Sequence, residues 1–216
     1  MRKVAILANG DFPRLRTAAR TVLKESEIIV ACDGAAATLW RKMRRRADYV
    51  IGDFDSLSPA ARRGLSVRVD TLVHEADQDT NDLTKAINFC RRQGWRNLVI
   101  VGATGKREDH TLGNIFRAME SGVKILTDEG VFLPFAAEAQ KWRLSLKHLG
   151  KGVPISIFAT DRNTQMVSVG LEWPLDNLKF ENLYCATLNR TISAELDIVS
   201  SRPAFVFIAK KNWTKI

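Results

Sequence analysis

Apolar and polar positions divide the chain into two parts with different patterns. Up to about residue 130, short continuous apolar runs alternate with segments whose apolar residues recur at helical spacing. Continuous apolar runs are typical of strands buried on both faces, and intervening helices favour a parallel sheet. The expected strands are Lys3–Ala8, Glu27–Cys32, Tyr49–Ile51, Val67–Val73, Asn97–Val101 and Lys124–Thr127. The expected helices lie near Arg14–Lys24, Ala35–Arg46, Ser58–Arg63, Asp82–Gln93 and Leu112–Ser121.

In the remainder, alternation with a period of two replaces the helical pattern, which indicates antiparallel strands with one buried face. We therefore predict an α/β protein. Residues 1–129 are expected to form a parallel-sheet domain with helices on both faces, and residues 130–216 an all-β, sandwich-like domain. A short helical stretch is expected before Gln140. The expected strands are Pro154–Ala159, Gln165–Val169, Leu183–Leu188, Thr191–Val199 and Ala204–Ala209.

Composition places the chain among ordinary globular proteins. Of its 216 residues, 45% are hydrophobic and 26% are charged, a balance that excludes a disordered or collagen-like chain. The longest apolar runs have six residues or fewer, whereas a membrane span needs about 20, so we expect no membrane partner. The short apolar start is unlike a signal peptide, and Cys32, Cys90 and Cys185 follow no metal-ligand spacing. A reducing, cytoplasmic location is expected.

The chain is basic, with 33 Lys and Arg against 24 Asp and Glu and a formal net charge of +9. A basic surface can bind nucleic acid or a polyphosphate. The densest cluster, Arg41–Arg46, lies on an expected helix and has no interleaved aromatic residue beyond Trp40. A solvated helix face is therefore favoured there over a nucleic-acid footprint.

Two aspartates follow the expected strand Tyr49–Ile51. Asp53 and Asp55 are two positions apart, so in an extended chain they point to the same side. Adjacent carboxylates repel unless a cation lies between them or one is protonated, and oxygen ligands suit Mg²⁺. A helix cap is the alternative for Asp55 alone. For the pair, a magnesium site is favoured.

A second acidic group opens the helix that follows the fourth expected strand. Asp79 and Asp82 lie near its start with Gln78, where the helix dipole stabilises anions. Capping of the helix by Asp79 is the structural alternative. Asp82 and Lys85 are three positions apart and face the same way. This spacing would place a metal-binding carboxylate beside a phosphate-binding ammonium.

A loop rich in glycine and basic residues leaves the fifth expected strand. Its two glycines, the second being Gly105, permit close approach of a phosphate. Lys106 and Arg107 add positive charge next to a helix start. The spacing matches neither a Walker A loop nor the dinucleotide fingerprint. The alternative is an ordinary strand-to-helix turn capped by Asp109, with His110 in a structural role.

These loops, together with Asn9-Gly10-Asp11 and the loop at Asp33, all follow strands of the expected parallel sheet. Loops at the carboxyl ends of parallel strands converge on one edge of the sheet. Carboxylates that hold magnesium beside cations that hold phosphate are the groups that phosphoryl-type transfer requires. The sequence therefore predicts a phosphoryl-transfer site at this edge.

With these motifs in this order, the sequence resembles the thiamine pyrophosphokinases. The matched patterns are Asp-Gly-Gly/Ala-Ala at Asp33–Ala36, Gly-Asp-Phe-Asp-Ser at Gly52–Ser56, Asp-Gln…Thr-Asp…Lys-Ala at Asp77–Ala86 and Gly-Gly-Arg-x-Asp-His…Asn at Gly105–Asn114. The chain departs from the family pattern at four positions. Ala37 replaces an asparagine, Asn81 a threonine, Lys106 the second glycine, and Leu188 the serine of a Ser-Asn pair that ends at Asn189.

The resemblance implies transfer of the β,γ-diphosphate of ATP to the hydroxyl of thiamine, with AMP released. It implies a homodimer in which residues 1–129 bind ATP and Mg²⁺ and residues 130–216 contribute to the thiamine site. Asp53, Asp55 and Asp82 are expected to hold Mg²⁺ and, with Asp109, to form the catalytic set. The expected ATP contacts are Asp33, Gln78, Lys85, Gly105, Lys106, Arg107 and His110. The expected thiamine contacts are Asn189 and Trp173.

Several alternatives stay open. Leu188 is compatible with a related Mg²⁺-dependent pyrophosphokinase that acts on another small alcohol, such as a pterin. An inactive nucleotide-binding relative is a second alternative. A basic nucleic-acid-binding module would leave the acidic loops without a purpose, so no nucleic-acid partner is expected. Either Asp109 or Asp79 could accept the hydroxyl proton, and Trp142 and Trp213 join Trp173 as candidate aromatic walls for the thiazolium.

Overall fold

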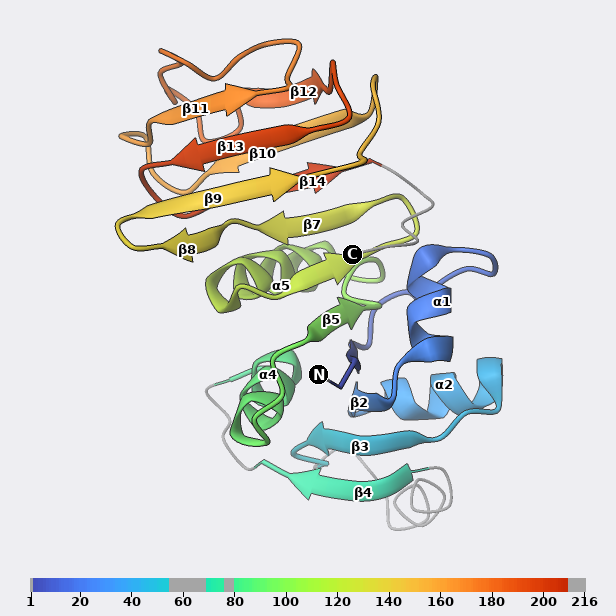
Figure 1. The fold of residues 1–216 in the computed structure, drawn as a ribbon. Helices are drawn as coiled ribbons and strands as arrows, with labels where there is room; N and C mark the ends of the chain where they lie inside the picture. The colour runs from blue at the N-terminus through green and yellow to red at the C-terminus, as the bar shows by residue number, and fades with distance from the viewer. Residues whose placement is uncertain (1, 55–68, 76–79, 210–216) are drawn as a thin grey trace. The chain divides into compact units, whose positions relative to one another are not determined.

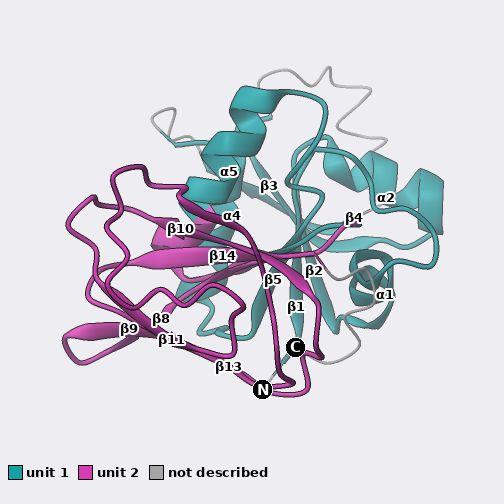
Figure 2. Cartoon of the chain, turned by 90° about the horizontal axis from the view of Figure 1, so that it is seen from above, with its two compact units in different colours: residues 1–117, 125–128 teal, residues 118–124, 129–216 magenta. Residues whose placement is uncertain are grey.

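The computed structural model describes residues 2–54, 69–75 and 80–209 (Figure 1). It divides into two compact units (Figure 2). Unit 1 comprises residues 1–117 and 125–128, and unit 2 comprises residues 118–124 and 129–216. The helix expected near Ser58–Arg63 lies outside the described residues. No described helix is both long enough and apolar enough to span a bilayer.

Unit 1 is built on a parallel sheet with helices on both faces, as predicted. Its strand order is β6-β5-β1-β2-β3-β4, and β5, β1, β2, β3 and β4 pair in parallel. In Figure 1, α1 and α2 lie on one side of this sheet, and α4 and the first part of α5 lie on the other. The strands are β1 (Val4–Leu7), β2 (Ile28–Cys32), β3 (Ala47–Gly52), β4 (Val69–His74), β5 (Leu98–Val101) and β6 (Lys124–Leu126). The helices are α1 (Ala18–Glu25), α2 (Ala35–Met43), α4 (Asp82–Arg92) and α5 (Glu108–Ser121), the last turn of which belongs to unit 2.

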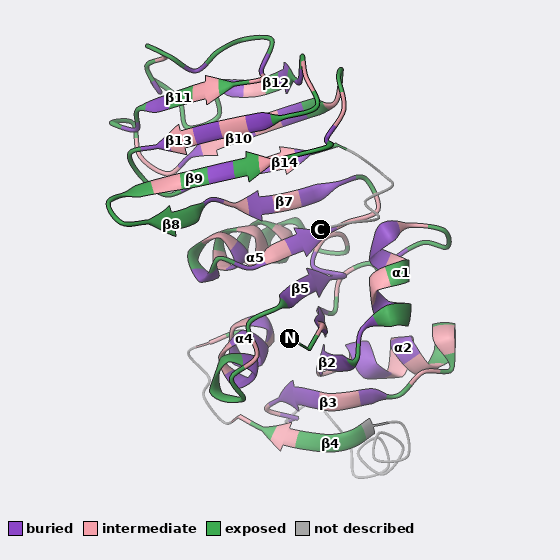
Figure 3. Cartoon of the chain, in the orientation of Figure 1, coloured by how far each residue is buried: buried purple, intermediate pink, exposed green. Residues whose placement is uncertain are grey.

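The core of unit 1 follows from its apolar runs. Every residue of β1, β2 and β5 is buried, and Figure 3 shows these strands in the colour of buried residues.

α4 begins where Asn81 accepts a hydrogen bond from the Thr84 N–H at 2.9 Å. The alternative of a cap at Asp79 is therefore wrong. Asparagine is as good an N-cap as aspartate, and Asn81 directly precedes the first helical residue.

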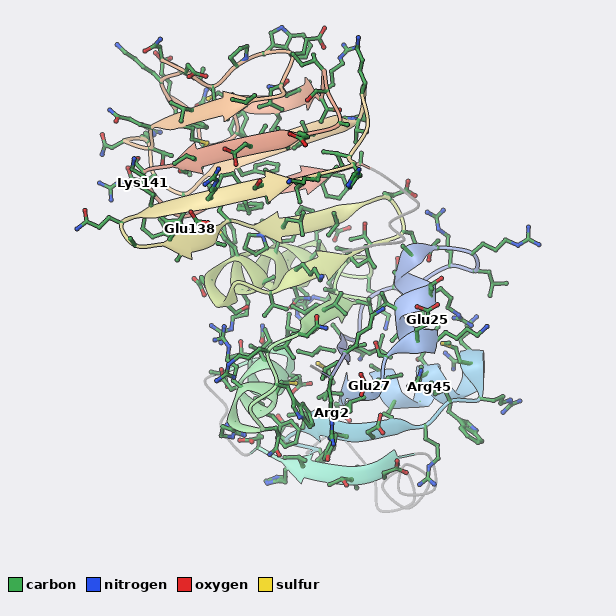
Figure 4. All side chains as sticks on the ribbon, in the orientation of Figure 1. Arg2, Glu25, Glu27, Arg45, Glu138 and Lys141 are labelled. Carbon is green, nitrogen blue, oxygen red and sulfur yellow. The ribbon has the colours of Figure 1, made fainter. Side chains whose placement is uncertain are left out.

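The basic cluster at the end of α2 is partly used by the fold. The Arg45 guanidinium donates to the carbonyl oxygens of Leu23 and Lys24 at 2.5 and 2.7 Å, so it closes the carboxyl end of α1 (Figure 4). Arg46 forms an ion pair with Asp70 at 3.2 Å. A positively charged side chain satisfies unpaired carbonyls at a helix end and offsets the helix dipole there. The expected helix ends earlier than predicted: α2 stops at Met43, and Arg44, Arg45 and Arg46 follow it rather than lying on a helix face.

Unit 2 consists of antiparallel strands in two layers, which Figure 2 shows one beside the other. The strand orders within this unit are β12-β10-β14-β7 and β11-β13-β9-β8. Buried and less buried residues alternate along β10 and β13, as expected for strands that face a core on one side. The predicted all-β fold class is confirmed. The strands are β7 (Val131–Pro134), β8 (Ala136–Glu138), β9 (Lys141–Leu146), β10 (Pro154–Ala159), β11 (Met166–Val169), β12 (Ala186–Arg190), β13 (Leu196–Ser200) and β14 (Ala204–Ile208).

Three local expectations in this unit are wrong. The helical stretch before Gln140 is instead a hairpin, in which Glu138 of β8 pairs with Lys141 of β9 (Figure 4). The strand expected at Leu183–Leu188 starts only at Ala186, and the one expected at Thr191–Val199 only at Leu196. In all three cases the chain turns or bends within the expected element. The periodicity of apolar residues does not show where tertiary contacts reverse the backbone.

Candidate functional site

The topology of unit 1 creates a switch point beside β1. The chain passes from β1 through β2 and β3 to β4 on one side, then returns to place β5 on the other side of β1. Connections that leave neighbouring strands in opposite directions open a crevice at the carboxyl ends of the strands. A cavity of about 780 Å³ lies there. Eight predicted site residues line it: Asp53, Asp82, Lys85, Gly105, Lys106, Arg107, Asp109 and His110.

Close backbone packing joins the loops after β1 and β5 into one wall of this cavity. The Gly10 N–H donates to the Gly102 carbonyl oxygen, and the Asp11 N–H to that of Thr104, each at 2.7 Å. A Cβ atom on Gly10 would overlap the carbonyl oxygens of both Gly102 and Thr104. Glycine is therefore required at position 10 so that the two loops can interlock.

Lys85 lies between two of the predicted metal-binding carboxylates. Its side chain is 4% exposed, and its Nζ is 3.9 Å from Asp53 Oδ2 and 4.0 Å from Asp82 Oδ1. Asp53 follows β3 directly and Asp82 is the first residue of α4. A buried ammonium is stable only when it is paired. The three side chains therefore form one charge cluster, built from the loop after β3 and the first turn of α4.

The carboxylates of this cluster repel one another. Burial raises the pKa of Asp82, the nearby Asp33 and Asp53 carboxylates add to this rise, and Lys85 opposes it. Asp33 follows β2, and its N–H donates to the Ile51 carbonyl oxygen at 3.0 Å. It does not line the cavity, but it contributes to the negative potential there. Such a cluster gains stability from an additional cation.

The donor set suits a hard divalent cation. Mg²⁺ is commonly held by one or two carboxylates together with water and substrate phosphates, and Asp53 and Asp82 supply two carboxylates. Among the described residues, no three His, Cys, Asp or Glu side chains are grouped closely enough to hold a metal ion by themselves. The third predicted ligand, Asp55, lies outside the described residues, as does Gln78.

The loop between β5 and α5 supplies the basic side of the cavity. α5 begins at Glu108, four residues before its expected start, so Asp109 lies in the first helical turn rather than capping it. Arg107 donates to both carboxylate oxygens of Asp109, with Nε 3.0 Å from Oδ1. This hydrogen bonding lowers the pKa of Asp109 to about 2. In this arrangement Arg107 and Asp109 neutralise each other at the edge of the cavity.

Three further residues that line the cavity belong to the predicted loops and motifs but had no assigned role. Asn9 follows β1 and accepts two hydrogen bonds from the Lys106 ammonium. Asn114 donates from Nδ2 to the Ala103 carbonyl oxygen at 2.9 Å and so ties α5 to the loop before it. Cys32 ends β2, and burial raises the pKa of its thiol, so it stays neutral. For Asn9 the available signal was its position after a buried strand, since a neutral side chain carries no charge pattern.

The predicted thiamine contacts lie in unit 2 and touch each other. Asn189 is buried, and its side chain accepts from the Trp173 N–H at 3.2 Å and donates to the Trp173 carbonyl oxygen at 2.7 Å. Trp173 is 51% exposed, and the Arg190 guanidinium lies 5.4 Å from its ring centroid. Asn189 thus holds the backbone of an exposed aromatic residue. Trp142 is half-buried in β9, and Trp213 lies outside the described residues.

Comparison with known proteins connects the cavity to a family. The family model described as "Thiamin pyrophosphokinase, catalytic domain" matches residues 19–127, about half of the chain, including Asp53, Asp82, Lys85 and the Gly105–His110 loop. "Thiamin pyrophosphokinase 1" of Caenorhabditis elegans is 26% identical over 224 residues, which cover 97% of this chain and 90% of the worm protein. "Thiamine pyrophosphokinase" of Bacillus subtilis is 26% identical over 161 residues, 72% of each chain.

Solved structures share the fold. A thiamin pyrophosphokinase family protein from Enterococcus faecalis superposes with a TM-score of 0.75 at 19% identity, over 98% of this chain and 100% of the other. Thiamin pyrophosphokinase from Candida albicans gives a TM-score of 0.74 at 19% identity, over 96% and 89%. These likenesses concern the fold, whereas the family model covers the motifs at the cavity. The resemblance seen in the sequence is thereby confirmed, and the chain belongs to the thiamin pyrophosphokinase family.

Proposed function

We propose that this chain is an enzyme that transfers the β,γ-diphosphate of ATP to the hydroxyl of thiamine and releases AMP. The main observation in favour of this proposal is that the buried Lys85 ammonium lies between the carboxylates of Asp53 and Asp82. This cluster lines a cavity whose other side carries Lys106 and Arg107. A polyphosphate that bridges a metal-binding acidic side and a cationic side fits this division of charge. The family membership of the chain supports the same activity.

In this proposal Asp53 and Asp82 hold Mg²⁺, together with Asp55. The bound ion would neutralise charge on the phosphate oxygens. Lys85 lies within 4.0 Å of both described carboxylates, so its ammonium limits their repulsion and can donate to a phosphate oxygen on the cavity side. Lys106 and Arg107 bind further phosphate oxygens through charge-assisted hydrogen bonds. Asp33, Gly105, His110 and Gln78 remain proposed ATP contacts.

The ion pair between Arg107 and Asp109 affects whether Asp109 can accept the proton of the thiamine hydroxyl. While the pair is intact, Asp109 is a weak base because its pKa is about 2. When Arg107 turns to a phosphate, Asp109 loses the hydrogen bonds that lower its pKa, and its basicity rises. ATP binding would thus prepare Asp109 to accept or orient the thiamine hydroxyl proton. The other candidate, Asp79, lies outside the described residues.

Unit 2 carries the proposed thiamine surface. Trp173 is exposed and has the Arg190 guanidinium near its ring, so the ring face already attracts a cation, as thiazolium binding requires. Leu188 is 86% exposed and Ile192 is 50% exposed. Both residues are within three positions of Asn189, which contacts Trp173, and exposed apolar side chains favour a contact surface. We propose that this surface contributes to thiamine binding and to a homodimer.

Calorimetry and a turnover assay test the proposal. ATP is titrated with and without Mg²⁺, and AMP release is then measured with thiamine or with a hydroxymethyl pterin as acceptor. We expect Mg²⁺-dependent ATP binding and thiamine-dependent AMP release. Asp53→Asn should lower turnover by about a hundredfold or more with the fold intact, whereas Asp197→Asn, in a unit 2 ion pair, should not. Normal Mg²⁺-dependent turnover by Asp53→Asn would contradict the site, and pterin-dependent turnover alone would contradict the substrate.

A further inference from the structure

Lys106 adopts a backbone conformation that favours glycine. Its φ is +61°, and the preceding Gly105 has a φ of +82°. In this left-handed region a Cβ atom crowds the following carbonyl oxygen, which glycine avoids. Lysine is also the residue that departs from the second glycine of the family motif. A side chain at this position lowers the stability of the backbone conformation, so a lysine here is unfavourable unless its side chain has a role.

The Lys106 side chain is placed by Asn9. Its Nζ donates to the Asn9 backbone oxygen at 2.8 Å and to Asn9 Oδ1 at 3.1 Å. Both acceptors are neutral, and no carboxylate in the described part of the chain forms an ion pair with this ammonium. Neutral oxygens bind an ammonium less strongly than anionic oxygens do. The ammonium is therefore held in place while its charge stays available to an anion.

The contact between Asn9 and Lys106 spans the switch point of the sheet. Asn9 follows β1 and Lys106 precedes α5, so the contact joins the loops that leave the two neighbouring strands. The same loops are joined by the backbone hydrogen bonds of Gly10 and Asp11. Both Asn9 and Lys106 line the cavity that contains Lys85. Asn9, which accepts the hydrogen bonds, is therefore held in place by its loop. The Lys106 ammonium that it binds lies on the wall of the cavity.

We propose that Asn9 and Lys106 form a clamp for the polyphosphate of ATP. Asn9 is a positioning residue that holds the Lys106 ammonium at the cavity before nucleotide arrives, and phosphate oxygens then replace its two oxygens as acceptors. Because the ammonium is already placed, ATP binding orders less of a long side chain. The clamp recognises polyphosphate charge, so it favours ATP over AMP. This inference rests on the proposed function and adds Asn9 and nucleotide discrimination to it.

Calorimetric titration with ATP and with AMP, in Mg²⁺ and without thiamine, tests the clamp. Lys106→Gly should weaken ATP binding about tenfold and AMP binding by less than about twofold. Its melting temperature should not fall, because glycine adopts the positive φ freely. Arg44→Gly is the matched control. Arg44 is exposed, has a φ of +53° and does not line the cavity, so its replacement removes the same charge and relieves the same conformation.

A double-mutant cycle tests the positioning role of Asn9. Asn9→Ala should weaken ATP binding about threefold in the natural chain and leave it nearly unchanged when residue 106 is glycine. An equal loss in both backgrounds would mean that Asn9 only supports its loop, and would overturn the assignment. The clamp is also overturned if Lys106→Gly binds ATP normally, or if Arg44→Gly weakens ATP binding as much.

The titrations separate this inference from the proposed function. If the natural chain binds ATP with the expected variant pattern but releases no AMP with thiamine, the proposed function fails and the clamp stands. If thiamine turnover is present and the variant pattern is absent, the clamp alone fails. If ATP does not bind at all, both fail.

Discussion

The Nζ of Lys85 lies 3.9 Å from Oδ2 of Asp53, which joins the first turn of α4 to the end of β3. Lys85 also lies 4.0 Å from Asp82 in its own helix. One ammonium thus pairs with two carboxylates, one in the loop after β3 and one in the first turn of α4. The lysine side chain is buried and both carboxylates are only partly so, and all three groups line the cavity.

Replacing Lys85 by methionine should lower turnover by about a hundredfold or more, because the two carboxylates lose their shared cation. Lys85 opposes the rise in the pKa of Asp82, so its removal raises that pKa further. A group with a higher pKa becomes protonated at higher pH, and the acidic limb of the pH–rate profile should therefore move to higher pH. Lys85→Arg keeps the charge and should leave this limb closer to its original position. An unchanged acidic limb in Lys85→Met would contradict the coupling.

Replacing Arg107 by glutamine should remove the hydrogen bonds that Arg107 donates to the Asp109 carboxylate. The hydrogen bonds from Arg107 hold the pKa of Asp109 at about 2, so in Arg107→Gln the carboxyl should titrate at higher pH, near its ordinary value. Carboxyl chemical shifts followed by NMR during an acid titration measure this directly. The KM for ATP should also rise. Arg143→Gln removes an arginine from a similar exposed pair with Asp197 in unit 2 and should leave the KM for ATP unchanged. If Asp109 still titrates near pH 2 in Arg107→Gln, the cause of the shift is misassigned.

Arg45→Ala should destabilise unit 1. The substitution leaves the carbonyl oxygens of Leu23 and Lys24 without the guanidinium that closes α1, and we expect a loss of about 1–3 kcal/mol in the free energy of unfolding. Arg41→Ala removes an exposed arginine of the same cluster and should change stability by less than about 0.5 kcal/mol. Urea denaturation measures both. If the two variants have the same free energy of unfolding, the hydrogen bonds of Arg45 to the end of α1 do not contribute to stability.

Asn189→Ala should weaken the binding of thiamine and leave the binding of ATP unchanged. The substitution removes both side-chain hydrogen bonds to the Trp173 backbone, so the ring loses its support and the KM for thiamine should rise about tenfold. ATP binding, measured without thiamine, should stay unchanged. Trp173→Phe keeps an aromatic face and should retain more thiamine affinity than Trp173→Ala. If all three variants keep the natural KM for thiamine, thiamine does not use this surface.

Parts of the fold and site could be predicted because their signals are local. The runs at β1, β2 and β5 are continuous and apolar, and buried parallel strands require that pattern. The spacing of Asp82 and Lys85 follows from helix geometry alone. By contrast, the hairpin of β8 and β9 and the late starts of β12 and β13 depend on where the chain reverses. The cap at Asn81 was missed because neighbouring aspartates offered equally good capping groups.

The sequence alone was sufficient for the class of fold and for the family, because the periodicity of apolar residues and the spacing of motifs are properties of short segments. It was not sufficient for the pairing of groups within the site. Asn9 and Lys106 are 97 positions apart, and they meet only because β5 lies next to β1 rather than beyond β4. Strand order depends on how the whole chain packs, so the partner of a charged side chain at a sheet edge emerges only when the loops have been brought together.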